Sequence, residues 1–310
     1  MKICFYGVGG VGGYYAALLT QYLKENNETD VYFIARGAHR DQILKNGLLL
    51  KKDGGKEPIL VHPHSCTDTV DDLPIFDIVV VSVKGYDLET ATRDIKKMTD
   101  ENSAILPLLN GADIYERMRQ HLSHGCIFPA CLYVSTHIES PGVIFQTGGN
   151  GQIAVGSDPE YPEHSPEKWI TLFKNAGIPI DFFEDVNIEI WKKYIFIAPF
   201  ALVTATFDKT MGEVVDDPDL GMLVQNIMEE VYLIAGALNV SLPSDIVETS
   251  FSKARHFPFE TKTSLQRDVE TKGRQSEWDL FGGSIVRYAE KFQIAAFHTR
   301  KTLDKLLNLI

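Results

Sequence analysis

The sequence predicts an α/β fold, with an N-terminal doubly wound parallel sheet followed by an all-α domain. Three observations support this prediction. The first thirteen residues place a glycine-rich turn between a short apolar run and an apolar segment of helical length. Continuous apolar runs then alternate with helix-like segments through the first half of the chain. Beyond residue 186 the apolar residues recur at helical spacing, and strand-like runs disappear.

Length and composition indicate a globular protein of two domains. The chain has 310 residues, of which 44% are hydrophobic and 23% charged, as in ordinary soluble proteins. Its formal charge of −12 argues against a nucleic-acid partner or an anionic membrane surface, since both attract basic patches. We find no secretory signal and no uninterrupted apolar run of about 18 residues, the length of a membrane span. We therefore expect a cytoplasmic protein.

The cysteines and histidines do not predict a metal site. The four cysteines, at positions 4, 66, 126 and 131, have no paired spacing typical of metal ligands. His62 and His64 flank a proline, but no third ligand is evident beside them. We expect no bound metal.

The glycine-rich turn has the GxGxxG spacing of dinucleotide-binding, Rossmann-type domains. Gly7 permits the tight turn, Gly9 lets the backbone approach a pyrophosphate, and Gly12 lets the helix pack closely on the strand. The helix that follows directs its N–H groups and positive dipole end toward the phosphates. The alternative is a glycine-rich turn without a ligand. The residues predicted to contact the cofactor here are Gly7, Val8, Gly9, Gly10, Val11 and Gly12.

The end of the second predicted strand, residues 30–35, indicates which nucleotide binds. An acidic residue at this position is typical of an NAD site, where it accepts hydrogen bonds from the ribose. This sequence has Arg36 there and Arg40 one helical turn later. A guanidinium suits a 2′-phosphate and favours NADP (NADPH) as the cofactor. The alternative for Arg36 is a solvated arginine at a strand end.

Further strands are predicted through the rest of the first half. Residues 48–51 and 59–62 form a predicted hairpin around Asp53-Gly54-Gly55. Residues 76–83 and 104–109 are continuous apolar runs typical of central parallel strands. These two runs end at Lys84 and Asn110, at the edge of the sheet where ligands bind. Three more runs predict strands at residues 127–134, 142–146 and 151–156.

The second half is predicted to be helical. We place the boundary near residues 184–186, giving a dinucleotide-binding domain at 1–185 and a helical substrate and dimerisation domain at 186–310. Pro218 and Pro243 lie near helix ends, where proline is expected. The predicted helices cover residues 187–207, 219–238, 244–254, 283–292 and 299–307.

The sequence resembles the ketopantoate reductase (2-dehydropantoate 2-reductase) family over nearly its whole length. Six ordered motifs carry the resemblance, and together they are far more specific than any one alone. They are GVGGVGG at 7–13, IARGAH at 34–39, VSVKGYD at 81–87, LLNG at 108–111, WKKY at 191–194 and SLQRDVETKGRQSEWD at 264–279.

The resemblance implies a role for five residues. Lys193, two residues after a tryptophan, matches the lysine that donates the proton, and an ammonium is suited to protonating the alkoxide left by hydride transfer. Lys84 matches a residue that helps place cofactor and substrate. Asn110 matches the one that bridges the nicotinamide ribose and the substrate. Ser264 matches a contact to the substrate carboxylate, and Glu277 matches a carboxylate that contacts the cofactor near the active lysine.

Three of these roles have a structural alternative. Glu189 lies four residues before Lys193, in the favourable orientation for a surface ion pair on a helix. Lys84 and Asn110 are in positions where a side chain can simply cap a loop.

Three positions depart from the family pattern. Family members with ketopantoate activity have asparagines that hold the substrate where this chain has Ile197, Ala201 and Met211. Ile197 and Ala201 follow Lys193 by four and eight residues, on the same helix face. We expect an apolar pocket wall there, and weaker binding of a hydroxylated substrate by about 1 kcal/mol or more per lost hydrogen bond.

The leading hypothesis is an NADPH-dependent reductase of a 2-keto acid with Lys193 as proton donor. By resemblance the substrate is ketopantoate, reduced to pantoate for pantothenate and coenzyme A synthesis. One alternative is a more apolar keto acid on the same scaffold. Another is a non-catalytic NADP-binding sensor, which the presence of Lys84, Asn110, Lys193 and Glu277 disfavours. A homodimer is expected because dimers are the commonest assembly.

Overall fold

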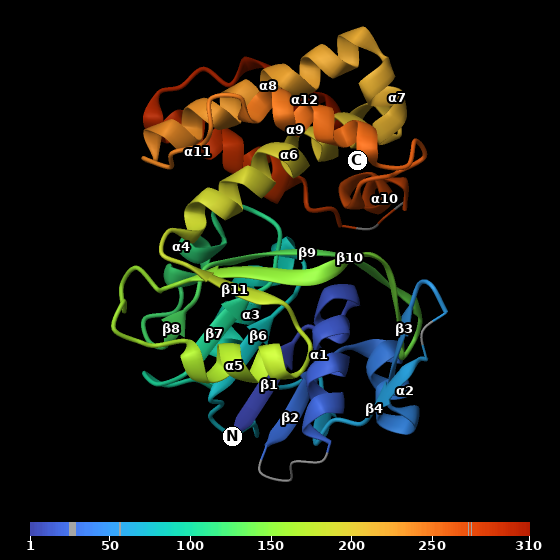
Figure 1. The fold of residues 1–310 in the computed structure, drawn as a ribbon, viewed down its shortest axis with the longest axis vertical. Coiled ribbons are helices and arrows are strands. Elements are labelled where there is room, and N and C mark those ends of the chain that lie inside the picture. Colours follow the sequence, from blue (N-terminus) through green and yellow to red (C-terminus); the bar gives the residue numbers. More distant parts are fainter. Residues whose placement is uncertain (25–28, 56, 272, 274) are drawn as a thin grey trace. The chain divides into compact units, whose positions relative to one another are not determined.

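The computed structural model describes residues 1–24, 29–55, 57–271, 273 and 275–310, and it divides the chain into two compact units (Figure 1). The first unit comprises Met1–Leu109 and Ile114–Val186, and the second comprises Asn110–Asp113 and Asn187–Ile310. The main division falls next to the predicted boundary. The segment at 110–113 was expected in the first domain, but its contacts group it with the helical unit.

A six-stranded parallel sheet forms the centre of the first unit. Every neighbouring pair in it is parallel, and the order β5-β2-β1-β6-β7-β8 is 3-2-1-4-5-6 when its strands are counted along the chain. This is the doubly wound order, which confirms the predicted fold class, and it reverses direction between β1 and β6. The strands are β1 (Lys2–Tyr6), β2 (Asp30–Ile34), β5 (Ser65–Thr67), β6 (Ile78–Val81), β7 (Ala104–Pro107) and β8 (Cys126–Ile127).

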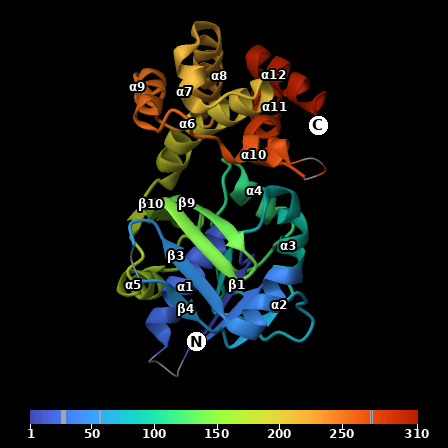
Figure 2. The ribbon, with the colours of Figure 1, turned by 90° about the vertical axis from the view of Figure 1, so that its right-hand side faces the viewer.

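A second, mixed sheet was not predicted. It has the order β11-β10-β3-β4, and β9 pairs with β10 (Figure 2). The predicted hairpin is confirmed, since β3 and β4 pair antiparallel. The strands are β3 (Leu48–Lys52), β4 (Ile59–Val61), β9 (Ala130–Ser140), β10 (Val143–Gly156) and β11 (Ile180–Phe183).

The strands predicted after residue 126 were wrong in two respects. A single strand was expected at 127–134, but the chain leaves β8 before Pro129 and enters β9 in the other sheet. Proline has no N–H to give to a strand ladder, so a break there is physically reasonable. The runs at 142–146 and 151–156 are two parts of the single strand β10, which pairs with β9 through three register shifts.

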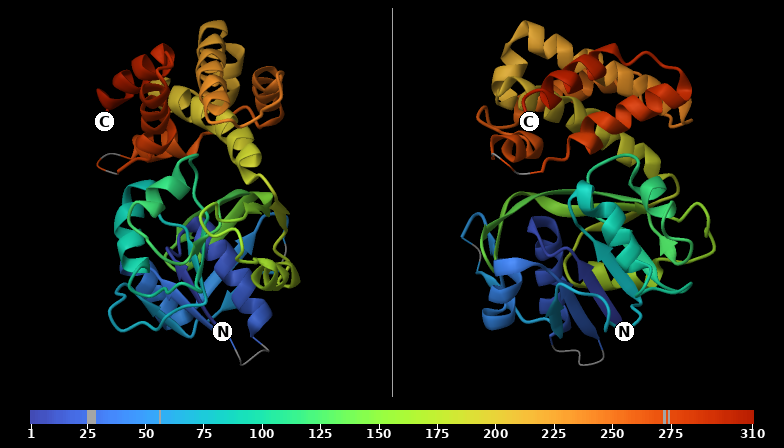
Figure 3. Two further views of the ribbon diagram at one scale, coloured as in Figure 1. Left: turned by 90° about the vertical axis from the view of Figure 1, so that its left-hand side faces the viewer. Right: turned by 180° about the vertical axis from the view of Figure 1, so that it is seen from behind.

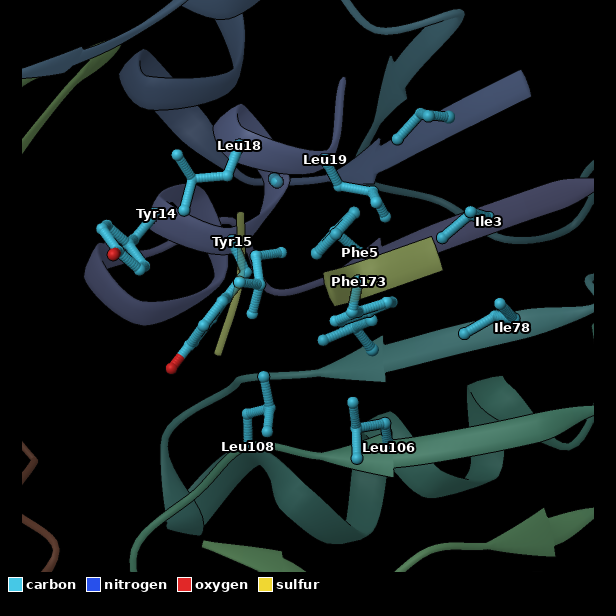
Figure 4. Close-up of a cluster of buried hydrophobic side chains, with 14 of the residues drawn as sticks. Ile3, Phe5, Tyr14, Tyr15, Leu18, Leu19, Ile78, Leu106, Leu108 and Phe173 are labelled. Carbon is cyan, nitrogen blue, oxygen red and sulfur yellow. The ribbon is translucent and has the colours of Figure 1, made fainter. Parts of the chain in front are cut away.

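Helix α1 (Gly10–Leu23) contacts strands of both sheets. It is therefore buried on nearly every side, which explains why its sequence is apolar all round. The Tyr15 hydroxyl donates a hydrogen bond to the Gly151 carbonyl of β10 (3.1 Å). In Figure 4, Phe5 of β1 and Tyr15 of α1 lie in one cluster with Phe173 of α5 (Glu167–Asn175).

The opposite face of the parallel sheet carries the alternate side chains of the same strands, such as Cys4, Val79 and Ile105, which are also buried. Seen from behind, α3 (Leu88–Ile95) lies over this face (Figure 3, right). A short 3-10 turn at Gly85–Asp87 leads into it. The remaining helices of this unit are α2 (Gly37–Asn46) and α4 (Ile114–Arg119).

The second unit is helical, as predicted. Helix α8 packs against α7, α9, α11 and α12. All five predicted helices are confirmed within a few residues, whereas α7 and α10, of six and seven residues, were missed. The helices are α6 (Val186–Phe207), α7 (Met211–Asp216), α8 (Pro218–Ala237), α9 (Ile246–Lys253), α10 (Ser264–Glu270), α11 (Ser284–Phe292) and α12 (Phe297–Leu307), with a 3-10 turn η2 (Ala254–His256) and a π turn η3 (Asp279–Gly283).

Helix α6 is the element that carries Lys193. Within the described part of the chain it is the one helix long and apolar enough to cross a membrane, with a mean hydropathy of 1.2. Its apolar window is 72% buried inside the protein. Burial of this extent is what the central helix of a folded helical unit requires.

Candidate active site

The glycine loop lies between β1 and α1, where the strand order of the parallel sheet reverses. Gly7 has φ +96°, and a Cβ on Gly12 would overlap the Gly7 carbonyl oxygen. Packing therefore explains these two glycines. A Cβ on Gly9 would meet nothing within 4 Å, so the protein itself does not require glycine there. Open space beside the backbone at the N-terminus of a helix fits a pyrophosphate, and the loop fits a dinucleotide.

The other predicted loop residues have structural roles. Val8 is buried, and a Cβ on Gly10 would press on the Thr136 carbonyl of β9. Val11 is half-buried and packs against the core of the first unit. His39 lies in α2, where its Nδ1 accepts a hydrogen bond from the Gly142 N–H (3.0 Å). Burial lowers the pKa of His39 and so favours this neutral form.

Arg36 lies at the carboxyl end of β2, as predicted, and already has an acidic partner. Its guanidinium forms an ion pair with Asp87, which raises the pKa of Arg36. The Arg36 side chain is 71% exposed, so solvent screens the pair. Arg40 pairs in turn with Asp41 and Asp68. A 2′-phosphate at this edge would compete with carboxylates for both guanidinium groups.

Asp87 was overlooked in the sequence, although it ends the VSVKGYD motif. The available signal was its place just after a central strand, at the same sheet edge as Arg36. Lys84 begins the same turn, half-buried, and its carbonyl accepts a hydrogen bond from the Asp87 N–H (2.9 Å).

Lys193 and Asn110 are brought together within the helical unit. The Lys193 Nζ donates a hydrogen bond to the Asn110 Oδ1 at 2.9 Å, across 83 positions of sequence. The alternative ion pair of Glu189 forms with the adjacent Lys192 (2.8 Å). An amide oxygen that accepts one N–H of an ammonium fixes the direction of that group. This pair is the part of the helical unit best suited to acid chemistry.

Glu277 and Ser264 also lie in the helical unit, on separate elements. Glu277 is buried just before η3, and its carbonyl accepts from the Leu280 N–H (3.0 Å). Ser264 is exposed at the first position of α10. The cap of that helix, Thr263, shares a hydrogen bond with Thr204 of α6 (2.7 Å). Two members of the surrounding motif, at 272 and 274, lie outside the described residues.

The three positions that depart from the family pattern differ in exposure. Ile197 is half-buried, whereas Ala201 and Met211 are only 2% and 4% exposed. Met211 begins α7 beside a capping box formed by Thr210 and Glu213. The expected apolar wall thus consists of one partly accessible side chain and two that pack inside the unit.

In the residues that the structure describes, no group of three or more histidine, cysteine or acidic side chains could hold an ion. His64 instead lies beside Asp30, with Nδ1 and Oδ1 3.2 Å apart.

Comparison with known proteins identifies the family. Residues 3–160 match the family model described as "Ketopantoate reductase PanE/ApbA", and residues 185–309 match its C-terminal counterpart. The chain belongs to the ketopantoate reductase family. Members of this family are pyridine-nucleotide-dependent oxidoreductases that act on CH–OH groups. The matched ranges divide between the two units near residue 185.

The proteins similar to this ketopantoate reductase family member include enzymes described by different activities. An uncharacterized oxidoreductase, YkpB, of Bacillus subtilis is 26% identical over 96% of this chain and 94% of its own. The 2-dehydropantoate 2-reductase structure of Porphyromonas gingivalis is 29% identical, with a TM-score of 0.84 over 99% of both chains. A D-mandelate dehydrogenase, solved with NADH and anilino(oxo)acetate, shares the fold at 18% identity, with a TM-score of 0.86 over 100% of this chain and 98% of its own.

Proposed function

We propose that this protein reduces a 2-keto acid, with NADPH as the preferred cofactor and Lys193 as the proton donor. The observation that carries the proposal is the 2.9 Å hydrogen bond between the Lys193 ammonium and the Asn110 amide oxygen. The open backbone at Gly9 and the cation at Arg36 support the cofactor half of the proposal. A non-catalytic nucleotide sensor would have no need of an oriented ammonium.

The proposed chemistry assigns each residue a physical task. When bound, the reduced nicotinamide supplies the hydride. The Lys193 ammonium stabilises the negative charge that develops on the keto oxygen and transfers a proton to it. Asn110 holds that ammonium in one direction, so less entropy is lost when the substrate binds. Ser264 is proposed to contact the substrate carboxylate through its hydroxyl.

Ketopantoate is the first substrate we propose, because family membership supports it. The finer structure also favours a second candidate, a 2-keto acid with an apolar or aromatic tail. Ile197, the partly accessible one of the three departing positions, is apolar where family members with ketopantoate activity have an asparagine. Phe196 of α6 stacks on Phe257, with ring centroids 5.5 Å apart, and Phe257 is exposed. Phenylglyoxylate, the keto acid related to mandelate, is the natural probe of this alternative.

A substrate panel separates the two candidates. The oxidation of NADPH would be followed with ketopantoate, phenylglyoxylate and a branched aliphatic 2-keto acid, with NADH as the cofactor control. We expect ketopantoate to give the highest kcat/KM with NADPH. A preference for phenylglyoxylate would establish the apolar alternative. No turnover of any keto acid, together with tight NADPH binding, would contradict the proposal and favour a sensor.

The cytoplasmic location and the homodimer stay predictions.

A further inference from the structure

The short segment 110–113 is grouped differently from the residues that flank it in the sequence. Leu109 and Ile114 on either side of it belong to the first unit, yet the segment itself groups with the helical unit. Asn110 begins this segment and bonds to Lys193, and Asp113 ends it. The contacts that hold Asp113 in place therefore also limit the positions that Asn110 can take.

Asp113 is held by α11. The Ser284 hydroxyl donates a hydrogen bond to the Asp113 Oδ2 at 2.7 Å, across 171 positions of sequence. Asp113 is 7% exposed and Ser284 is fully buried, so the bond is shielded from water. Arg287, one helical turn after Ser284, donates to the same carboxylate oxygen at 3.3 Å and to the Ser284 hydroxyl at 3.2 Å.

The π turn η3 connects this cluster to α6. Asp279 pairs with Arg287 at 2.6 Å, and a Cβ on Gly283 would overlap the Asp279 carboxylate. Glycine at 283 is therefore needed for Asp279 to reach Arg287. The hydroxyl of Tyr194, the residue after Lys193, donates to the Leu280 carbonyl of η3 at 2.7 Å in a buried bond. Turns of the π type occur often at functional sites.

We propose that Asp113, Ser284 and Arg287 form a latch that positions Asn110 on Lys193. Asp113 follows Asn110 by three positions, a span of at most about 11 Å of extended chain, so fixing one end restricts the other. The latch keeps Asn110 with the helical unit although the chain enters and leaves the segment from the first unit. These three are positioning residues, which act through Asn110. The inference rests on the proposed function of Lys193.

Ser284→Ala tests the latch with the smallest change, because alanine preserves the helix. The matched control is Ser250→Ala, the same change at another buried serine of the helical unit, in α9. We expect Ser284→Ala to lower kcat about 10- to 100-fold, as misplacement of a catalytic group does, with the KM for NADPH within about twofold. An equal effect of the two variants would overturn the proposal.

A double variant tests whether the latch acts through Asn110. Adding Ser284→Ala to Asn110→Ala should lower kcat no further than Asn110→Ala alone, because the positioned group is already gone. Independent losses, whose effects on kcat multiply in the double variant, would overturn the proposal.

Asp113→Asn serves as a second variant if Ser284→Ala does not fold. Its amide oxygen still accepts from Ser284 but carries no charge toward Arg287, so we expect kcat to fall below the parental value. Full parental kcat in Asp113→Asn would count against the latch.

A readout without substrate distinguishes failure of the latch from failure of the proposed function. The rate at which an amine-specific reagent labels Lys193 would be measured by mass spectrometry in parent and variants. Loosening Asn110 exposes the lysine nitrogen, so we expect labelling to rise at least about twofold in Ser284→Ala and not in Ser250→Ala. Unchanged labelling would overturn the latch. A rise in a protein that reduces no keto acid would support the latch and contradict the function.

Discussion

At the scale of single residues, opposite charges meet at the sheet edge that we propose to bind the cofactor. Arg36 is a residue on which the proposal of NADPH rests, and it already forms an ion pair with Asp87. A carboxylate beside a guanidinium opposes the arrival of a 2′-phosphate, since like charges repel. Asp87 therefore bears directly on the choice between NADPH and NADH.

Asp87→Asn should strengthen NADPH binding. Because the Arg36 side chain is 71% exposed, the pair is screened, and we expect the Kd for NADPH to fall only about two- to fivefold. The Kd for NADH, which has no 2′-phosphate, should stay the same. Fluorescence titration of each nucleotide measures this. Asp72→Asn, the same charge change at an exposed aspartate of this unit, is the matched control. Weaker NADPH binding in Asp87→Asn would mean that Asp87 orients Arg36 for the phosphate.

At the scale of helices, the helical unit depends on a cap supplied from a distant element. Glu230 of α8 is buried and accepts hydrogen bonds from the backbone N–H groups of His298 (2.7 Å) and Thr299 (2.9 Å). It thereby satisfies two N–H groups at the start of α12, which have no partner within their own helix, and places negative charge at the positive dipole end.

Glu230→Gln should destabilise the protein. The glutamine amide keeps one acceptor oxygen, but its NH2 group would face hydrogen-bond donors that the second carboxylate oxygen now accepts from. We therefore expect the free energy of unfolding to fall by about 1–3 kcal/mol. Glu229→Gln is the matched control, since that neighbour is exposed, and it should change stability by less than about 0.5 kcal/mol. Urea unfolding monitored by circular dichroism measures both. Equal midpoints for the two variants would show that the cap contributes nothing.

Elements with a strong local signal were predictable from the sequence. The strand, the turn and the helix at residues 2–23 are contiguous, and Gly7 and Gly12 are required by backbone geometry. The second sheet was missed because the pairing of β9 with β10 spans bulges that hide the period of a strand. Helices α7 and α10 were missed because they are too short to show a helical period.

At the scale of the whole molecule, the candidate site residues come from segments that are far apart in the sequence. Sequence motifs and the resemblance singled out Lys193 and Asn110, but nothing local indicates that Asp113 and Ser284 meet. Likewise, Arg36 and Asp87 belong to different motifs, 51 positions apart. Contacts of this kind depend on how the elements pack, which periodicity and spacing do not reveal.

The proposed function requires Lys193 to supply the proton, and Lys193→Ala removes that group. The rate of keto acid reduction and the Kd for NADPH would be measured in Lys193→Ala and in Lys192→Ala, the neighbouring lysine that pairs with Glu189. We predict that Lys193→Ala lowers kcat at least about 100-fold, in the range of general acid catalysis. The Kd for NADPH should change less than about twofold, and Lys192→Ala should resemble the parent. Parental kcat in Lys193→Ala would exclude Lys193 as the proton donor.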